Sequence, residues 1–139
     1  MEANKIQIGD WVMAYGIDHP VKVAGIDAEY EGDVWVKIQD GATVYSESLF
    51  NINPIPITEE ILEKNGFKDA PAKDTDAHNL VGKWWHKSGD VYVKKYCLSH
   101  GTYAHTIGFH PHTRIENIHN VHELQHALRL LGIEKEIEL

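Results

Sequence analysis

The chain has 139 residues, of which 42% are hydrophobic, and it carries a formal net charge of −8. This length suits one compact domain or two small units, and the apolar fraction is sufficient to build a hydrophobic core. No apolar run approaches the roughly 20 residues of a membrane-spanning helix, and the acidic balance argues against a general attraction to phosphate backbones.

Charge is distributed unevenly along the chain. Residues 1–57 hold three lysines against nine Asp and Glu residues, whereas residues 79–118 hold five Lys and Arg residues against two Asp and Glu. Nine of the ten histidines fall between His78 and His126. The two halves are therefore expected to differ in their electrostatic character.

The N-terminal residues and the cysteine content indicate a cellular compartment. The first residues lack a basic start followed by an apolar stretch, so we expect no signal peptide. The single cysteine, Cys97, cannot form an intrachain disulfide. A reducing cytoplasm is the expected location.

Residues 9–57 are predicted to form short strands separated by turns. The expected strands cover 11–15, 21–26, 34–38, 43–46 and 53–57, with a single helical turn over 47–51 before the last. Asp40-Gly41 is a strong signal for a hairpin between two of them. Five short strands with a helical turn before the last is the order of an SH3-like small β-barrel, which we expect over residues 1–57.

Residues 58–78 are predicted to be a connector made of a short helix and a loop. Thr58 suits the N-cap of a helix over 59–65, and Asn65-Gly66 suits its end. Residues 68–78 are polar and show no periodicity, which indicates a linker or a mobile loop.

Residues 79–139 are predicted to form an antiparallel β-meander covered by a C-terminal amphipathic helix. Strands are expected over 82–86, 91–96, 102–109 and 113–118, and Gly101 and Gly108 are read as turn or bulge positions. Asn120 suits the helix N-cap with Glu123 as its capping-box partner, and Gly132 suits its end. Alternation over 133–139 predicts a short final strand. The fold class is therefore α+β.

The run His122-Glu123-Leu124-Gln125-His126 matches the HExxH pattern of zinc proteases. Two histidines four residues apart on a helix can bind one zinc ion, and the intervening glutamate can activate its bound water. A zinc-dependent hydrolase is therefore one hypothesis for the function.

Three observations argue against this hypothesis. Only 13 residues follow His126, which leaves little chain for a third ligand. The apolar stripe of the helix places His122 and His126 on the opposite side, so both are predicted to face solvent. Glu123 already has a capping role.

A wider histidine cluster keeps metal binding open. His110 and His112 would share one face of a strand, and His119 immediately precedes the helix that carries His122 and His126. These five histidines are the candidate zinc ligands. The alternative, which we favour, is a solvated His-rich loop, so that no cofactor is expected.

The meander also carries cations interleaved with aromatic residues. A sheet that presents aromatic rings beside cations can stack bases and contact phosphates. Because alternation must turn some of these aromatics into the core, the alternative is that they pack against the helix. The candidate face for nucleic acid or another partner comprises Lys83, Trp84, Trp85, Lys94 and Lys95.

Three segments resemble a set of short, uncharacterised proteins of gut Bacteroidales and their tailed phages or prophages. They are Ile8-Gly9-Asp10-Trp11-Val12, residues 54–67 and residues 121–135. Residues 68–116 match only in length and strand-like character. The family has no assigned activity, so no catalytic residue transfers. In it the position of Glu123 is often Gln, which implies a capping rather than a catalytic role.

Three functions follow from these observations. The first is a non-enzymatic interaction module, an accessory protein of phage or mobile-element type, which acts on a protein partner in the cytoplasm of a bacterial host or phage-infected cell. The second is the zinc-dependent hydrolase, and the third is nucleic-acid binding by the basic aromatic meander. No membrane partner is expected.

Overall fold

The computed structural model describes residues 1–71, 79–86, 91–109 and 113–139. The fold is α+β, with antiparallel sheets and two α-helices in the described part of the chain, as the sequence predicts. The chain divides into two compact units, residues 1–56 with 120–122, and residues 57–119 with 123–139. None of the described helices is long and apolar enough to cross a bilayer.

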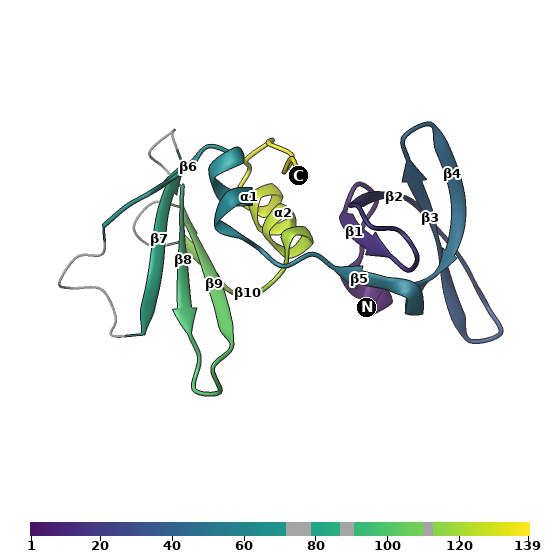
Figure 1. Ribbon diagram of the computed structural model, residues 1–139, viewed down its shortest axis with the longest axis horizontal. Helices are drawn as coiled ribbons and strands as arrows, with labels where there is room; N and C mark the ends of the chain where they lie inside the picture. Colours follow the sequence, from purple (N-terminus) through teal and green to yellow (C-terminus); the bar gives the residue numbers. More distant parts are fainter. Residues whose placement is uncertain (72–78, 87–90, 110–112) are drawn as a thin grey trace. The chain divides into compact units, whose positions relative to one another are not determined.

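The first unit contains a five-stranded antiparallel sheet in the order β4-β3-β2-β1-β5 (Figure 1). Two short 3-10 helices accompany it, η1 (Ala3–Lys5) and η2 (Leu49–Asn51). The strands are β1 (Trp11–Ala14), β2 (Val21–Tyr30), β3 (Asp33–Asp40), β4 (Thr43–Ser48) and β5 (Ile52–Pro54).

Local sequence signals explain most of the first unit. Asp40 pairs with Thr43 across the predicted hairpin, and Gly41 has a φ of 57°, which an L side chain adopts at a cost. The helical turn expected before the last strand is η2, with the Ser48 hydroxyl accepting from the Phe50 N–H. β4 and β5 are the edge strands, and their backbones are not paired with each other in the described residues, so the sheet is open.

Alternating apolar residues form the core of the first unit. The buried side chains come from every strand except β4, together with η2 and the segment after η1. They are Ile6, Val12, Ala14, Val21, Val23, Val36, Ile38, Leu49 and Ile52.

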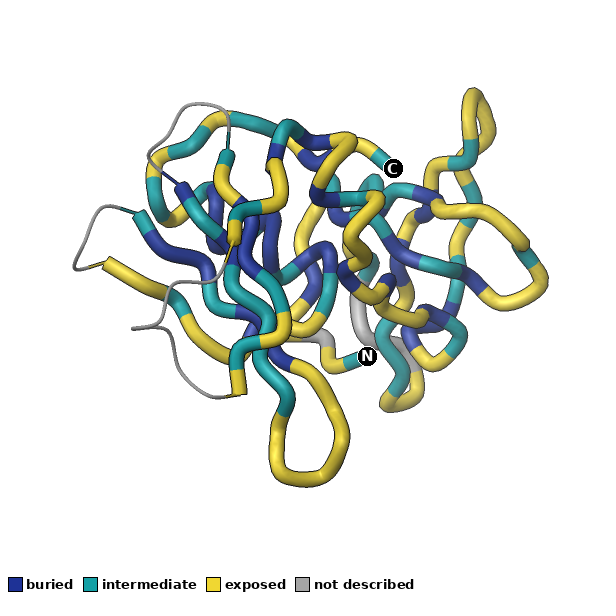
Figure 2. Tube along the Cα trace, turned by 60° about the vertical axis from the view of Figure 1, so that its left-hand side comes forward, coloured by how far each residue is buried: buried dark blue, intermediate teal, exposed yellow. Residues whose placement is uncertain are grey.

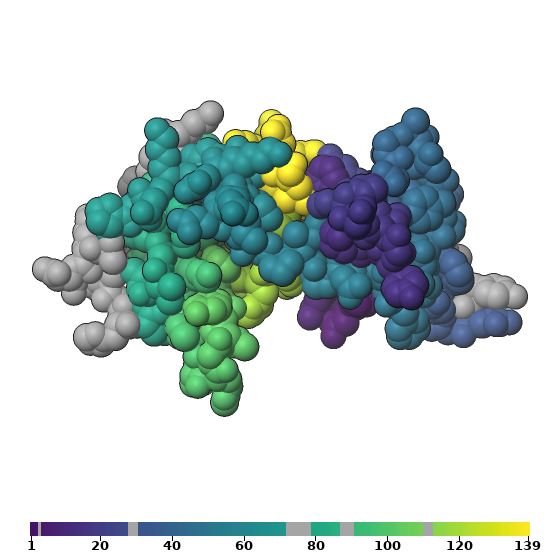
Figure 3. Space-filling model, in the orientation of Figure 1, coloured from purple at the N-terminus to yellow at the C-terminus, as the bar shows by residue number. Residues whose placement is uncertain are grey.

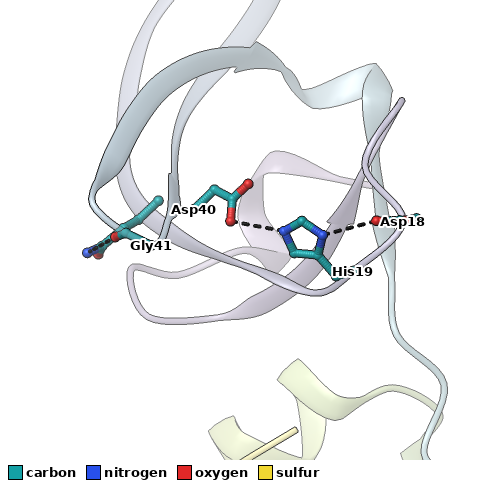
Figure 4. A network of polar contacts seen from close by, with 5 residues as sticks. Asp18, His19, Asp40 and Gly41 are labelled. Atoms are coloured by element: carbon teal, nitrogen blue, oxygen red, sulfur yellow. Dashed lines mark hydrogen bonds and ion pairs between the residues drawn. The ribbon is translucent and has the colours of Figure 1, made fainter.

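A surface histidine connects two turns of the first unit (Figure 4). The His19 ring lies 3.1 Å from an Asp18 oxygen through Nδ1 and 2.9 Å from an Asp40 oxygen through Nε2. Hydrogen bonding to Asp40, then to Asp18, raises the pKa of His19 above its ordinary value of 6.5. The same contact lowers the pKa of Asp18.

The second unit contains a five-stranded antiparallel sheet in the order β10-β9-β8-β7-β6. Both α-helices, α1 (Glu59–Lys64) and α2 (Val121–Leu130), lie on one side of it, which we call the helix side (Figure 1). The strands are β6 (Phe67–Asp69), β7 (Leu80–His86), β8 (Val91–Cys97), β9 (Tyr103–Phe109) and β10 (Thr113–Ile118). The turn between β8 and β9 projects from the sheet (Figure 3).

Two elements of the second unit differ from the sequence prediction. The predicted linker over 68–78 begins with β6, which pairs with β7 from Phe67↔His86 to Asp69↔Trp84. The predicted final strand over 133–139 is not a strand, because other bonds occupy its backbone. Residues 72–78 lie outside the described residues.

Two buried side-chain amides hold this C-terminal tail. The Asn65 amide accepts from the Glu138 N–H at 2.8 Å and donates to the Glu138 carbonyl at 2.8 Å. The Gln125 amide donates to the Lys135 carbonyl at 3.0 Å and accepts from the Ile137 N–H. These two side chains make the backbone hydrogen bonds that a neighbouring strand would otherwise make. Asn65 is fully buried, at 0% exposed.

Burial alternates along the strands of the second sheet (Figure 2). In β8, Val91 and Val93 are buried and Tyr92 and Lys94 are only partly so. Val91 lines a helix-side cavity together with Leu128 of α2. The helix side of the sheet is therefore its apolar face.

We predict that Asn65→Ala loosens the C-terminal tail. The substitution leaves two backbone groups of Glu138 and one of Ile61 without their side-chain partner. A buried polar group without a partner costs about 1–3 kcal/mol, so the free energy of unfolding should fall by about 3 kcal/mol. Urea denaturation and amide hydrogen exchange at 133–139 measure both effects. Asn79→Ala is the control, since the exposed Asn79 side chain donates to the Cys97 carbonyl at 3.5 Å. Equal losses of unfolding free energy in both variants would contradict the role of Asn65 in holding the tail.

We also predict a pH-dependent contribution from His19. Because its folded pKa lies above 6.5, its protonated form stabilises the fold. This contribution is fully present below the unfolded pKa of about 6.5 and is lost as pH rises through the raised folded pKa. The stability difference between wild type and His19→Gln should therefore shrink as pH rises, and an NMR titration should place His19 above 6.5. A difference that grows with pH would contradict this.

Candidate functional site

The face of the second sheet opposite the helices carries a row of aromatic and cationic side chains. Directly paired residues of an antiparallel sheet share one face. The pairs Lys68↔Trp85, Trp85↔Tyr92, Tyr92↔Gly108 and Gly108↔Arg114 cross all five strands. This face, which we call the outer face, therefore has two aromatic rings in the middle of the row and a cation at each end.

A second row on the outer face lies beside the first. Lys83 pairs with Lys94, and Lys94 pairs with Thr106. Two lysines directly opposite each other repel, which ordinarily disfavours such a pair. Lys83 is nonetheless only 7% exposed.

The aromatic rings of the first row offset this repulsion. The Lys83 amine lies 5.3 Å from the Trp85 ring centroid and 6.0 Å from that of Tyr92. The Lys94 amine lies 5.4 Å from the Tyr92 centroid. The electron-rich faces of these rings attract the ammonium groups. The outer face therefore places two ammonium groups close to aromatic rings.

Gly108 leaves room for the ring of Tyr92. A Cβ built on Gly108 would lie 2.0 Å from Tyr92 Cζ and 2.3 Å from its hydroxyl oxygen. The phenol end of Tyr92 therefore occupies the space that a side chain at position 108 would fill. Trp85 contacts Tyr92 edge-on, with ring centroids 5.2 Å apart and an interplanar angle of 62°. Trp85 itself is 36% exposed.

A hollow of about 260 Å³ adjoins the Tyr92 ring on the outer face. Its walls include two tyrosines, Tyr92 and Tyr96, and two cations, Lys94 and Arg114. Glu116, also in the wall, accepts from Arg114 at 3.0 Å. The hollow thus offers aromatic surface, cationic groups and a single carboxylate in one place.

The structure divides the five residues of the predicted partner face between the two faces of the sheet. Lys83, Trp85 and Lys94 lie on the outer face. Trp84 and Lys95 line a different hollow, on the helix side, and Trp84 is only 6% exposed. The prediction that Trp84 and Lys95 share a face with Trp85 is therefore wrong, because consecutive strand residues point to opposite faces.

The prediction that Gly108 is a turn or bulge residue is also wrong. Gly108 pairs regularly within β9. Gly108 lies under Tyr92 because of the pairing register between β8 and β9. That register could not be predicted from a single sequence. Gly101, by contrast, lies in a turn with a φ of 75°, as predicted.

The helix histidines are arranged differently from the prediction. His122 is 3% exposed, so its expected solvent exposure is wrong, whereas His126 is half-buried. The buried arc of α2 is wider than its apolar stripe, and it includes Gln125, which bonds the C-terminal tail. The Glu123 carboxylate accepts from the His119 N–H at 2.7 Å, one residue before the expected cap.

The candidate zinc ligands are not gathered in the described residues. His110 and His112 lie outside them. The His119 ring lies 3.1 Å from the Tyr103 carbonyl through Nδ1. Within the ranges that the structure describes, no group of three or more His, Cys, Asp or Glu side chains is placed to hold a metal ion.

The helix-side hollow that contains Trp84 and Lys95 also contains a buried histidine. Burial is the main cause that lowers the pKa of His105 to about 4, partly opposed by its bond to the Ile118 carbonyl. His105 is therefore neutral at neutral pH. The Trp84 indole N–H is buried and has no hydrogen-bond partner among the described residues.

No protein-family model, curated protein or solved structure matches the chain. The outer face is the candidate functional site on its own geometry, because it combines exposed aromatic rings, cations and a hollow on one sheet.

We predict that Gly108→Ala displaces Tyr92 and destabilises the second sheet. The new methyl group overlaps the phenol ring, and overpacking of this kind costs about 1–3 kcal/mol. Chemical denaturation of four proteins, wild type, Gly108→Ala, Tyr92→Ala and the double variant, measures the coupling. The cost of Gly108→Ala should largely disappear in the Tyr92→Ala background. Additive costs would show that Tyr92 does not rest on Gly108.

Proposed function

We propose that this protein is a non-enzymatic binding module whose outer sheet face binds single-stranded nucleic acid. The observation that carries the proposal is the row Lys68-Trp85-Tyr92-Gly108-Arg114, which sets two rings between two cations on the sheet face opposite the helices. Bases stack on the rings while the cations contact phosphates.

The energetics of base stacking support this proposal. Each base stacked on an aromatic side chain contributes about 1–3 kcal/mol with little preference for sequence. Trp85 offers an exposed indole, and the phenol end of Tyr92 lies over Gly108, which has no side chain. Antiparallel sheets with aromatic residues on adjacent strands stack two or three bases in this way.

The charge distribution supports the location of the site. The chain as a whole is acidic at −8, so a long-range attraction to any nucleic acid is weak. On the outer face, however, the described residues include the cations Lys68, Lys83, Lys94 and Arg114, and the described lining of the hollow beside them includes one carboxylate, that of Glu116. Interactions beyond about 8 Å are screened at physiological salt, so these local cations dominate.

Duplexes are expected to bind more weakly than single strands. Stacking on Trp85 and Tyr92 requires an unpaired base whose face is free. In a duplex the bases are already stacked on each other, and only the phosphates remain to contact the lysines. The proposed ligand is therefore unpaired RNA or DNA.

We propose a second, supporting role for the first unit, as an SH3-like barrel that contacts a protein. Its strand order, with η2 before β5, supports this assignment. Two aromatic residues at its surface, Tyr15 at 79% exposed and Phe50 at 83%, are available for such a contact. The resemblance to short Bacteroidales and phage proteins suggests an accessory protein that works in the bacterial cytoplasm.

We predict that Trp85→Ala weakens binding to a fluorescein-labelled single-stranded 20-mer about tenfold or more, measured by fluorescence anisotropy. The expected loss is the stacking of one base. Trp35→Ala is the matched control, because Trp35 of the first unit is also 36% exposed on a strand. It should bind like wild type. Equal losses in both variants would contradict a site on the outer face.

The charge contribution is tested by salt dependence in the same assay. Lys94→Gln should weaken binding and reduce the slope of log K against log salt by about 0.7. Lys22→Gln is the control, since its amine lies 4.8 Å from the Trp11 ring in the first unit. No binding by wild type at low salt would overturn the proposal, and capture of a peptide by the outer face would replace it with protein binding.

A further inference from the structure

An apolar cavity of about 250 Å³ lies on the helix side of the second sheet. All of its lining residues belong to the second unit. Six of them are apolar and come from the sheet, α2 and the C-terminal tail: Phe67, Val91, Phe109, Leu128, Ile133 and Ile137. The cavity lies on the sheet face opposite the proposed nucleic-acid site, so the two are structurally separate.

The C-terminal tail keeps this cavity open. Ile133 and Ile137 contribute to its wall, and the tail around them is tied by the amides of Asn65 and Gln125. Because these bonds fix the backbone, the tail cannot collapse into the cavity without breaking them. Apolar cavities that do not collapse are costly to leave empty.

Among the described residues that line the cavity, the polar part of the wall includes one lysine. Lys135 lines the cavity, and its amine donates to the Asn65 carbonyl at 2.7 Å. The glutamates of the tail, Glu134, Glu136 and Glu138, are exposed and do not line the cavity. His86, also in the wall, packs edge-on against Phe67 with ring centroids 5.1 Å apart.

We propose that this cavity binds a compact apolar carboxylate, such as a medium-chain fatty acid. A cavity of about 150 Å³ lined by Leu, Ile and Phe admits benzene, so one of about 250 Å³ holds a larger apolar body. The Lys135 amine, which already donates to a carbonyl, pairs with the carboxylate at the polar end. Apolar walls with a single oriented charge are typical of small-molecule sites.

Octanoate and 1-octanol are the probes that test this proposal on the full-length protein. Octanoate should saturate one site per chain in isothermal titration calorimetry and bind about tenfold more tightly than the alcohol. In methyl-detected NMR it should shift the signals of Val91, Leu128 and Ile137 rather than those of Val21 or Val36 in the first unit. Equal affinity for acid and alcohol, or shifts that do not saturate, would overturn the proposal.

Two kinds of variant assign the binding to this cavity. Val91→Phe fills it and should lower octanoate affinity at least tenfold with an unchanged or higher melting temperature. If Val91→Phe does not fold, Ile133→Phe from the tail is the second filling variant. Retained octanoate binding in a folded filling variant would overturn the proposal.

The charge is tested with a matched pair of lysines. Lys135→Met should reduce octanoate affinity to that of octanol. Lys64→Met should not, although Lys64 also donates to the tail, at the Leu139 carbonyl, because it does not line the cavity. Equal losses in both variants would show that the lysines act only by holding the tail. Trp85→Ala should leave octanoate binding unchanged, which separates this test from that of the nucleic-acid site.

Discussion

The clamp between the Asn65 amide and the backbone of Glu138 is the contact on which the second unit most depends. One buried side chain satisfies both backbone groups of a residue 73 positions later in the chain. Its amide N–H also donates to the Ile61 carbonyl, which joins α1 to the same network. A tail with no partner strand is thereby fixed on the helix side. Without it, the apolar wall formed by Phe67, Leu128 and Ile137 would lie open to water.

The two faces of the second sheet follow from this closure. Helices and tail gather on one face, so the buried residues Val91, Val93 and Ile107 point there. The opposite face has no described element packed over Trp85, which keeps about a third of its surface exposed. The helix side of the second sheet therefore contains the core, and each of the two proposed sites uses one of the faces of the sheet.

Much of the local structure could be predicted from the sequence, because it depends on neighbouring residues. Thr58, Asn65-Gly66 and Asp40-Gly41 act within a few positions, and α1 and the β3–β4 hairpin lie where these signals place them. Structure that depends on residues distant in the chain could not be predicted in this way. β6 is a strand only because it pairs with β7, and the tail is extended because Asn65 and Gln125 hold it. Alternation separated Trp84 from Trp85, but only the fold shows that Trp84 is the covered one.

One pairing on the outer face is electrostatically unfavourable. Lys83 and Lys94 are directly opposed across two strands, and Lys83 is largely buried, which is unfavourable for like charges. Residues chosen only for stability would place an acid or a threonine at one of these positions. Sequences depart from such local rules chiefly at functional sites. Here the rings of Trp85 and Tyr92 offset part of the cost. An anionic ligand at the proposed site would add a further attraction to both ammonium groups, so the proposed function gives this pairing a physical reason.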